Sequence, residues 1–193
     1  MTGADRIKFE LAPSTSSPPT SSSYWVVSGL LLAGGYPGAL DPDEHCSKIQ
    51  DLVDAGIRTF VNLMEENETN QVGDPFVPYH DLAQQLCPDV TCVRHPIQDL
   101  SVPKPSEMVS ILDAIDATIR NGKPVYVHCW GGVGRTGTVI GCWLLRHKLA
   151  EPSDYLDVLM RLRQQDRERR HRMSPETAEQ QKFVRQRLER GDT

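Results

Sequence analysis

The sequence has few aromatic residues, few cysteines and no long apolar run. Aromatic side chains make up 6% of the 193 residues, and the five cysteines are scattered without a paired C-x-x-C pattern. This argues against a disulfide framework and a structural zinc site, and it favours reduced thiols of which at least one can react. No segment approaches the roughly eighteen apolar residues of a membrane span, and residues 1–20 lack the apolar core of a secretory signal. We therefore expect a cytoplasmic protein with no membrane partner.

An excess of positive charge is also missing. The 21 Lys and Arg residues are outnumbered by 26 Asp and Glu residues, which gives a formal net charge of −5. No nucleic-acid partner is therefore expected. A basic run from Arg161 to Arg172 is broken by Asp166 and Glu168; it is typical of a solvated helix face, with guidance of anionic substrates as the alternative. A chain of this length with 38% hydrophobic residues predicts one globular domain, which we expect to be a monomer.

The chain opens with a segment of low complexity. Residues 13–23 consist of Pro, Ser and Thr and carry no apolar side chain to bury. Such a segment cannot offset the entropy lost on ordering, so we predict a disordered leader over residues 1–23 and a folded domain over residues 24–190.

The domain alternates strand patterns with helix patterns and ends in helices alone, which predicts an α/β sandwich. A helix begins after Asp41 as N-cap, with Pro42 at its first position, and stops near Gly56. Residues 65–79 have no clear period and predict a long surface loop. Strands are expected at 24–27, 30–33, 59–63, 91–95 and 124–128. Further helices are expected at 106–121, around 139–145, at 153–163 and at 175–188.

A glycine-rich turn stands between a buried strand and a helix. It reads His-Cys-Trp-Gly-Gly-Val-Gly-Arg-Thr-Gly over residues 128–137. Such a turn gathers backbone N–H groups at the amino end of a helix, where the partial positive charge favours an anion such as phosphate. The residues expected to form this phosphate cradle are Trp130, Gly131, Gly132, Val133, Gly134 and Arg135.

Cys129 and Arg135 give this turn a chemical function. Cys129 lies at the mouth of the cradle, where the amides, the helix dipole and the Arg135 guanidinium all favour a thiolate. Arg135 follows Cys129 by six positions (135 − 129 = 6) and can fold back to bind two phosphoryl oxygens at once. A nucleophile and a phosphate clamp are thus predicted within one turn.

The pattern His-Cys, five residues and Arg-Thr resembles the signature loop of protein tyrosine and dual-specificity phosphatases. The resemblance covers about residues 24–188. It implies a cysteine-phosphatase fold with a central mixed sheet flanked by helices, and hydrolysis of phosphomonoesters without metal or cofactor. Cys129 would attack phosphorus to form a phosphocysteine intermediate, and Thr136 would donate a hydrogen bond to the departing thiolate.

Three further residues receive roles from this resemblance. The leaving group needs a proton, and Asp99, thirty residues before the cysteine (129 − 99 = 30), resembles the general acid of compact dual-specificity members. Gln180, with Gln181 as the alternative, resembles the glutamine that orients the attacking water. His128 is expected to brace the turn through hydrogen bonds rather than to act as a base.

Several other interpretations of the same residues remain to be weighed. The glycines also fit a dinucleotide-binding pattern, but the segment after residue 153 lacks the next strand and acidic residue of that fold, and no lysine completes a Walker loop. A phosphotyrosine-binding module without turnover and a cysteine oxyanion enzyme such as an arsenate reductase are further alternatives. Among the phosphatases that this chain resembles, those acting on inositol phosphates often carry lysines in the signature loop, whereas residues 130–134 are uncharged here. The resemblance therefore implies a phosphoprotein substrate, phosphotyrosine first and phosphoserine or phosphothreonine next, rather than an inositol phosphate.

Overall fold

The computed structural model describes residues 8–186, which form one sheet with helices on both faces. The five strands are ordered β1-β2-β5-β3-β4; β1 and β2 pair antiparallel and the other neighbours pair parallel. The predicted mixed sheet is therefore confirmed. The strands are β1 (Ser23–Val27), β2 (Leu31–Gly34), β3 (Thr59–Asn62), β4 (Thr91–Arg94) and β5 (Val125–His128).

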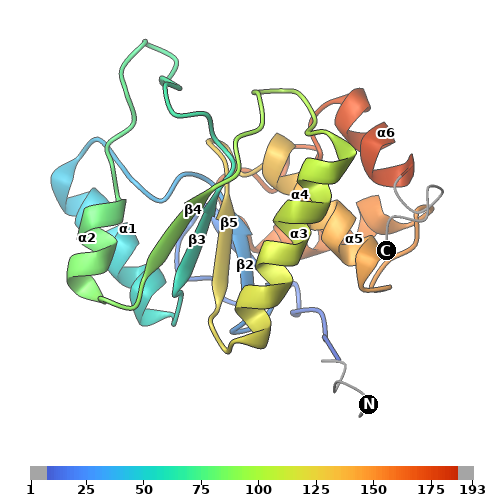
Figure 1. Cartoon of the computed structure of the whole chain (residues 1–193), viewed down its shortest axis with the longest axis horizontal. Coiled ribbons are helices and arrows are strands. Elements are labelled where there is room, and N and C mark those ends of the chain that lie inside the picture. Colours follow the sequence, from blue (N-terminus) through green and yellow to red (C-terminus); the bar gives the residue numbers. More distant parts are fainter. Residues whose placement is uncertain (1–7, 187–193) are drawn as a thin grey trace.

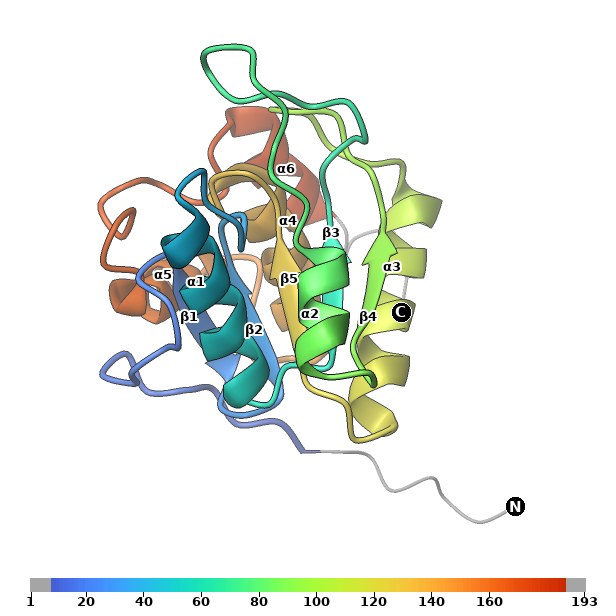
Figure 2. The same cartoon turned by 90° about the vertical axis from the view of Figure 1, so that its left-hand side faces the viewer.

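Helices cover both faces of the sheet, called here the first and the second face (Figures 1 and 2). On the first face are α1 (Pro42–Asp54) and α2 (His80–Leu86); on the second are α3 (Pro105–Arg120), α4 (Gly134–Arg146), α5 (Tyr155–Leu162) and α6 (Ala178–Gln186), with a short 3₁₀ turn at Arg163–Gln165. In the part of the chain that the structure describes, no helix is both long and apolar enough to cross a bilayer.

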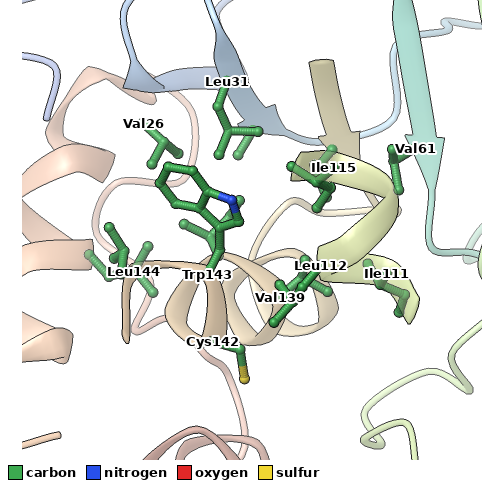
Figure 3. Close-up of a cluster of buried hydrophobic side chains, with 14 of the residues drawn as sticks. Val26, Leu31, Val61, Ile111, Leu112, Ile115, Val139, Cys142, Trp143 and Leu144 are labelled. Carbon is green, nitrogen blue, oxygen red and sulfur yellow. The ribbon is translucent and has the colours of Figure 1, made fainter. Parts of the chain in front are cut away.

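Strand β5 shows how the sheet separates two cores. Val125 and Val127 belong to the core under α3, α4 and α5, while Tyr126 belongs to the core under α1 and α2. This follows from the alternation of side chains along a strand. In the larger core the Trp143 ring of α4 points toward β1 and β2 (Figure 3), and its indole N–H donates to Asp116 Oδ1 at 2.9 Å.

Most element boundaries agree with the local signals in the sequence. The Asp41 side chain accepts a hydrogen bond from the Glu44 N–H at 2.9 Å and caps α1, as predicted. Helix α2 was not predicted, because its seven residues bury a single side chain, Ala83, and so carry no readable apolar period. Residues 187 and 188, predicted to end the last helix, lie outside the described residues.

The segment before β1 is ordered where the structure describes it, from residue 8 onwards, which corrects the predicted disorder of residues 8–23. The Ala12 N–H donates to the Val26 carbonyl at 2.9 Å. The Phe9 ring packs edge-on against the Trp143 ring, with 5.0 Å between the ring centroids. The Thr20 hydroxyl lies 2.8 Å from Ser23 Oγ. Local hydroxyl bonds and backbone pairing to the domain offset the entropy cost that composition alone suggested. Residues 1–7 of the predicted leader lie outside the described residues.

Four strands end at the same edge of the sheet. In the parallel ladders Gly34 of β2 and Asn62 of β3 both pair with His128 of β5, and Arg94 of β4 pairs with Asn62. The segments that follow β2, β3, β4 and β5 therefore emerge side by side. Ligands of α/β sheets bind at this carboxyl edge, and the segments that emerge here after β4 and β5 carry Asp99 and Cys129.

Candidate active site

The glycine-rich turn after β5, residues 129–135, is called here the cradle turn. Gly132 has a φ of +68°, and a Cβ built there would lie 2.4 Å from the carbonyl carbon of Gly34. Both the left-handed backbone and the close approach of β2 require glycine at this position. The turn leads into α4 at Gly134, so the positive end of the helix dipole lies at the turn.

The outside of the cradle turn is fastened by hydrogen bonds to its carbonyl groups. The Trp130 carbonyl accepts from the Tyr36 N–H at 2.8 Å, and the Val133 carbonyl accepts from the Ser174 hydroxyl at 2.6 Å. These bonds hold the turn from the carbonyl side, and a glycine-rich turn held in this way at the start of a helix can offer its backbone amides to an anion.

Cys129 lies at the start of the cradle turn and is 3% exposed. The Thr136 hydroxyl lies 3.1 Å from Cys129 Sγ and 3.3 Å from the Gly34 carbonyl oxygen. The hydroxyl has one proton, so it donates to the sulfur or to the carbonyl. The two residues that the sequence pairs as nucleophile and thiolate partner are in direct contact.

His128 is fully buried behind the cradle turn. Its Nδ1 lies 3.3 Å from the Cys129 carbonyl oxygen, and its Nε2 lies 2.7 Å from the Tyr79 hydroxyl. Burial lowers the pKa of His128 to about 3, so the ring is neutral at physiological pH. A carbonyl can only accept, hence Nδ1 carries the proton and Nε2 accepts from Tyr79. This geometry supports the predicted bracing role.

The guanidinium of Arg135 is 2% exposed and is held by a residue that the sequence did not indicate. Glu68, in the loop after β3, binds Arg135 with both carboxylate oxygens: Oε1 contacts Nη1, and Oε2 lies 2.9 Å from Nη2. The Ile97 carbonyl accepts from Nη1 at 3.1 Å. Two loops at the sheet edge thus fix the orientation of the predicted phosphate clamp.

Asp99, the predicted general acid, also contacts Arg135. Its Oδ1 lies 3.0 Å from Nη2, while Nε of Arg135 is buried without a hydrogen-bond partner among the described residues. Burial alone would lower the pKa of Arg135, but the bond to Glu68 and the charges of Cys129 and Asp99 raise it above its ordinary value. The guanidinium stays charged, with its Nε–H available to a phosphoryl oxygen.

The segment that carries Asp99 is held by Gln180. The Ser101 carbonyl of this segment accepts from Gln180 Nε2 at 3.1 Å. Leu100, between Asp99 and Ser101, has a φ of 60°, an uncommon conformation for a leucine, and its side chain is exposed. Asp99 itself is about half exposed, with 52% of its side chain accessible.

The structure separates the two candidate glutamines. Gln180 is fully buried, and a Cβ on Gly134 of the cradle turn would lie 3.1 Å from its amide. Gln181 points elsewhere and donates to the Pro175 carbonyl at 3.0 Å. The Gln180 amide oxygen already accepts from the N–H groups of Glu176 and Thr177. Orientation of a water by Gln180 therefore requires its amide to rotate.

A cavity of about 310 Å³ opens beside the cradle turn. The cradle turn and the Asp99 segment line it together with residues from beyond α5, namely Arg169, Arg172 and Glu176. A larger cavity of about 490 Å³ lies between the loop over residues 64–69 and β4, and it is lined by Tyr36, Tyr79 and Arg94 among others. The smaller cavity is the candidate active site because Cys129 and Arg135 line it.

The chain matches the family model described as "Polymorphic toxin system, DSP-PTPase phosphatase" over residues 42–149. This match covers more than half of the chain and includes Asp99, Cys129 and Arg135. The chain belongs to this phosphatase family. The resemblance to protein tyrosine and dual-specificity phosphatases is thereby confirmed.

The chain is also similar to curated proteins, among them a viral and a human one. It is 34% identical over 122 residues to 067L of Invertebrate iridescent virus 3, a predicted tyrosine phosphatase; the match covers 61% of this chain and 43% of the viral protein. It is 33% identical over 84 residues to human cyclin-dependent kinase inhibitor 3, covering 43% of this chain and 39% of that protein. The chain therefore spans less than half the length of both relatives.

Solved structures of phosphatases share the fold. Tk-PTP in its active form is 26% identical and superposes with a TM-score of 0.64, covering 88% of this chain and 97% of that one. Kinase associated phosphatase is 22% identical with a TM-score of 0.65, covering 83% and 86%. The cysteine-phosphatase fold of this family member is confirmed.

The structure thus brings together the residues that the sequence indicated and adds others. Glu68 and Tyr79 were missed because both lie in the segment 65–79, which carries no periodic pattern and was interpreted only as a surface loop. Their partners are about fifty to seventy residues away, Arg135 by 67 and His128 by 49. No local spacing rule indicates such contacts.

Proposed function

We propose that this phosphatase hydrolyses phosphomonoesters on phosphoproteins, phosphotyrosine first and phosphoserine or phosphothreonine as further substrates, through a phosphocysteine intermediate. The proposal rests on one observation: Cys129, Arg135 and Asp99 line the same cavity. Nucleophile, clamp and acid are the three groups that this reaction needs.

In the first step the Cys129 thiolate attacks phosphorus and the ester bond breaks. Arg135 binds two phosphoryl oxygens, using the Nε–H that has no other partner among the described residues. Asp99 gives its proton to the departing oxygen, so the product leaves as a neutral alcohol or phenol. For the Nη2 edge of Arg135 to bind phosphate, Asp99 has to leave its contact at 3.0 Å and turn toward the leaving group.

In the second step water hydrolyses the phosphocysteine. The Asp99 carboxylate takes a proton from the water, the new P–O bond forms, and the P–S bond breaks to return the thiolate and inorganic phosphate. Thr136, 3.1 Å from Cys129 Sγ, stabilises the returning thiolate by donating its hydroxyl proton to a hydrogen bond. Gln180 orients the water after rotation of its amide.

A phosphoprotein is favoured over a small, highly charged phosphate by the apolar side chains at the cavity. Trp130 and Leu100 line it, and Leu100 is 53% exposed. Such side chains contact a phenyl ring or a neighbouring peptide residue better than they contact water. The uncharged residues 130–134 of the cradle turn agree with this preference.

Hydrolysis of p-nitrophenyl phosphate in the presence of a chelator tests the proposal. We expect turnover by the wild type and none by Cys129→Ser, with the exposed thiol variant Cys46→Ser as the matched control at wild-type rate. A rapid quench in alkaline denaturant should leave a phosphoryl group on the peptide that contains Cys129, because the P–S bond of phosphocysteine is stable in alkali and labile in acid. Phosphotyrosine and phosphoserine peptides of one sequence then rank the substrates. If the wild type binds phosphotyrosine peptide without turnover, the protein is a binding module. If Cys129→Ser retains activity, the mechanism is refuted.

A further inference from the structure

The larger cavity, of about 490 Å³, is separate from the candidate active site and is called here the β3–β4 cavity. Its lining residues in the described part of the chain all differ from those of the active-site cavity. Small-molecule sites in proteins have volumes of about 300 to 1,000 Å³. The β3–β4 cavity is therefore large enough to bind a small ligand of its own.

Two neighbouring residues bring hydrogen-bond donors to this cavity from the edge of the sheet. Asn62 ends β3, Arg94 ends β4, and the two pair in the parallel ladder and line the cavity. Asn62 is 7% exposed, and its amide oxygen accepts from the Met64 N–H at 2.9 Å. The two N–H groups of Asn62 Nδ2 are thereby left without a partner among the described residues. They lie at the carboxyl edge of the sheet, where ligands of α/β folds bind.

Arg94 adds a positive charge that forms no ion pair with a described residue. Its Nη1 donates to the Met64 carbonyl at 2.8 Å and to the Glu65 carbonyl at 3.3 Å, so backbone groups hold the guanidinium in place. A guanidinium has five N–H donors, and those on Nη2 and Nε remain for a ligand. Together with the Asn62 amide they suit a carboxylate, which accepts several hydrogen bonds in one plane.

Three aromatic rings, called here the aromatic wall, line the same cavity: Tyr36, Phe76 and Tyr79. The Tyr36 ring centroid lies 4.7 Å from that of Phe76 and 5.5 Å from that of Tyr79. Both hydroxyls of the wall are engaged, since Tyr36 donates to the Val77 carbonyl at 2.7 Å and Tyr79 binds His128. The wall therefore offers apolar ring surface, which suits an aromatic ligand.

Glu65 and Glu66 also line the cavity, but both are exposed and the charge that acts on the aromatic wall is that of Arg94. Burial raises the pKa of Tyr36 to about 12, and the charge of Arg94 opposes this rise. Burial likewise raises the pKa of Tyr79, again against the charge of Arg94. Neither glutamate is among the groups that shift these two pKa values. One positive charge suits a carboxylate better than the near-dianion of a phosphomonoester.

Two lining residues of the β3–β4 cavity also hold the catalytic groups. The Glu65 N–H donates to Glu68 Oε1 at 2.7 Å, and Glu68 binds the Arg135 guanidinium. Tyr79 in turn holds His128 behind the cradle turn. A ligand that fits the cavity in this arrangement stabilises the loop that orients Arg135, and phosphate bound to Arg135 favours the same arrangement. Each ligand should then raise the affinity for the other by the same factor.

We propose that the β3–β4 cavity binds a small aromatic carboxylate, with its carboxylate on Arg94 and Asn62 and its ring against the aromatic wall, and that this ligand strengthens phosphate binding at the active site. The binding goes beyond the proposed function. The coupling to phosphate rests on the proposed function, because it requires that Arg135 binds phosphate.

Three probes with one ring system test the class of ligand: 2-naphthoate, 2-naphthamide and 2-naphthylmethylamine. Calorimetry on the whole protein should give a Kd for naphthoate about tenfold lower than for the amide, because hydrogen bonds between charged groups contribute that much. The amine should bind most weakly. Equal Kd values for naphthoate and the amide in the wild type, or tighter binding of the amine, overturn the site.

Arg94→Gln should remove the preference for naphthoate over the amide. Thr69→Glu tests the same point without changing a buried group, since Thr69 is exposed and lines the cavity; the added negative charge should reduce the preference. Arg120→Gln is the matched control, because Arg120 is exposed at the end of α3 and does not line the cavity. It should keep the wild-type Kd values. A preference that survives in both Arg94→Gln and Thr69→Glu overturns the site.

Inorganic phosphate at a concentration that saturates the active site tests where naphthoate binds. It should lower the Kd of naphthoate about fivefold, at the low end of usual coupling between sites. Naphthoate bound at the active site would instead be displaced, and a Kd that rises with phosphate overturns the second site. An unchanged Kd overturns the coupling. Cys129→Ser should still prefer naphthoate to the amide, so a wild type that hydrolyses no phosphomonoester overturns the proposed function and not the binding.

Discussion

Glu68 binds the Arg135 guanidinium with both carboxylate oxygens, although 67 residues separate the two in the chain. The contact joins the loop after β3 to the cradle turn after β5. Glu68 binds the terminal nitrogens Nη1 and Nη2 of Arg135, so that the Nε–H remains for phosphate. Glu68 therefore acts as a positioning residue: it touches neither the sulfur nor the expected position of phosphorus, but it sets the direction of the group that clamps the phosphate.

Glu68→Gln should lower kcat/KM for p-nitrophenyl phosphate by about ten- to a hundredfold, the value of a charge-assisted hydrogen bond pair. The amide keeps the size of the side chain and removes the charge that holds the buried Arg135. Bound substrate phosphate can itself partly orient Arg135. The variant should therefore regain part of the wild-type rate at high substrate concentration, so that KM rises by a larger factor than kcat falls.

Glu66→Gln in the same loop is the control for Glu68→Gln, because Glu66 is exposed and makes no ion pair among the described residues. Its steady-state constants should match those of the wild type. Equal kinetics of Glu68→Gln and the wild type would show that the observed carboxylate grip has no part in turnover.

Asp99→Asn should remove the basic limb of the pH–rate profile. A general acid has to carry a proton in the first step, so the wild-type kcat/KM should decrease on the basic side of its pH–rate profile. Asparagine cannot give a proton, and the variant should be slow and flat across that limb. A substrate whose leaving group needs no proton should recover most of the rate, as measured with a series of aryl phosphates of decreasing phenol pKa. A basic limb that persists in Asp99→Asn assigns the acid to another group.

The local signals in the sequence predict much of the fold. The Asp41 cap, the buried strand β5 and the apolar period of α3 are each predicted from neighbouring residues, and each agrees with the structure. The ordered segment over residues 8–23 and the short helix α2 were missed, because they are stabilised by contacts with distant parts of the domain rather than by their own pattern.

The candidate site divides in the same way. Cys129 and Arg135 stand in one turn, where their spacing predicts that they meet, and the role of the following residue, Thr136, was implied by the resemblance to the phosphatase signature. Glu68 reaches this turn because parallel strands end at one sheet edge, and that depends on the strand order β2-β5-β3-β4, which the sequence does not encode locally. The sequence likewise does not show that Gln180 contacts the Asp99 segment whereas Gln181 donates to the Pro175 carbonyl, because this depends on the direction of each side chain on α6.

Gly132→Ala should disrupt the cradle turn. The φ of +68° disfavours alanine, and its Cβ would lie within 2.4 to 2.7 Å of three backbone atoms of Gly34 and Gly35. We expect loss of turnover together with a lower melting temperature, because β2 and the turn have to separate. Gly131→Ala, whose Cβ would find its nearest atom at 4.0 Å, should keep the wild-type melting temperature. Equal melting temperatures for the two variants contradict the steric account.

The stability of the domain should fall in acid in a way that depends on His128. Burial lowers its pKa from the ordinary value of 6.5 to about 3, while the hydrogen bond to the Cys129 carbonyl acts in the opposite direction and the charges of Arg94 and Arg135 add to the lowering. Between these two pKa values the unfolded chain binds a proton at this ring and the folded protein does not. The free energy of unfolding is therefore fully retained above pH 6.5 and decreases as pH falls toward 3, by up to about 1.4 kcal/mol per pH unit.

His128→Gln removes this titration, so its free energy of unfolding should depend less steeply on pH than that of the wild type between pH 6 and 4, although its absolute stability is lower. Urea unfolding at a series of pH values measures both slopes, and carboxylates contribute equally to the two proteins. The exposed His80→Gln serves as control and should keep the wild-type slope, since 48% of the His80 side chain is accessible. Parallel slopes for His128→Gln and the wild type would mean that His128 accepts its proton without unfolding, and that burial does not hold the ring neutral.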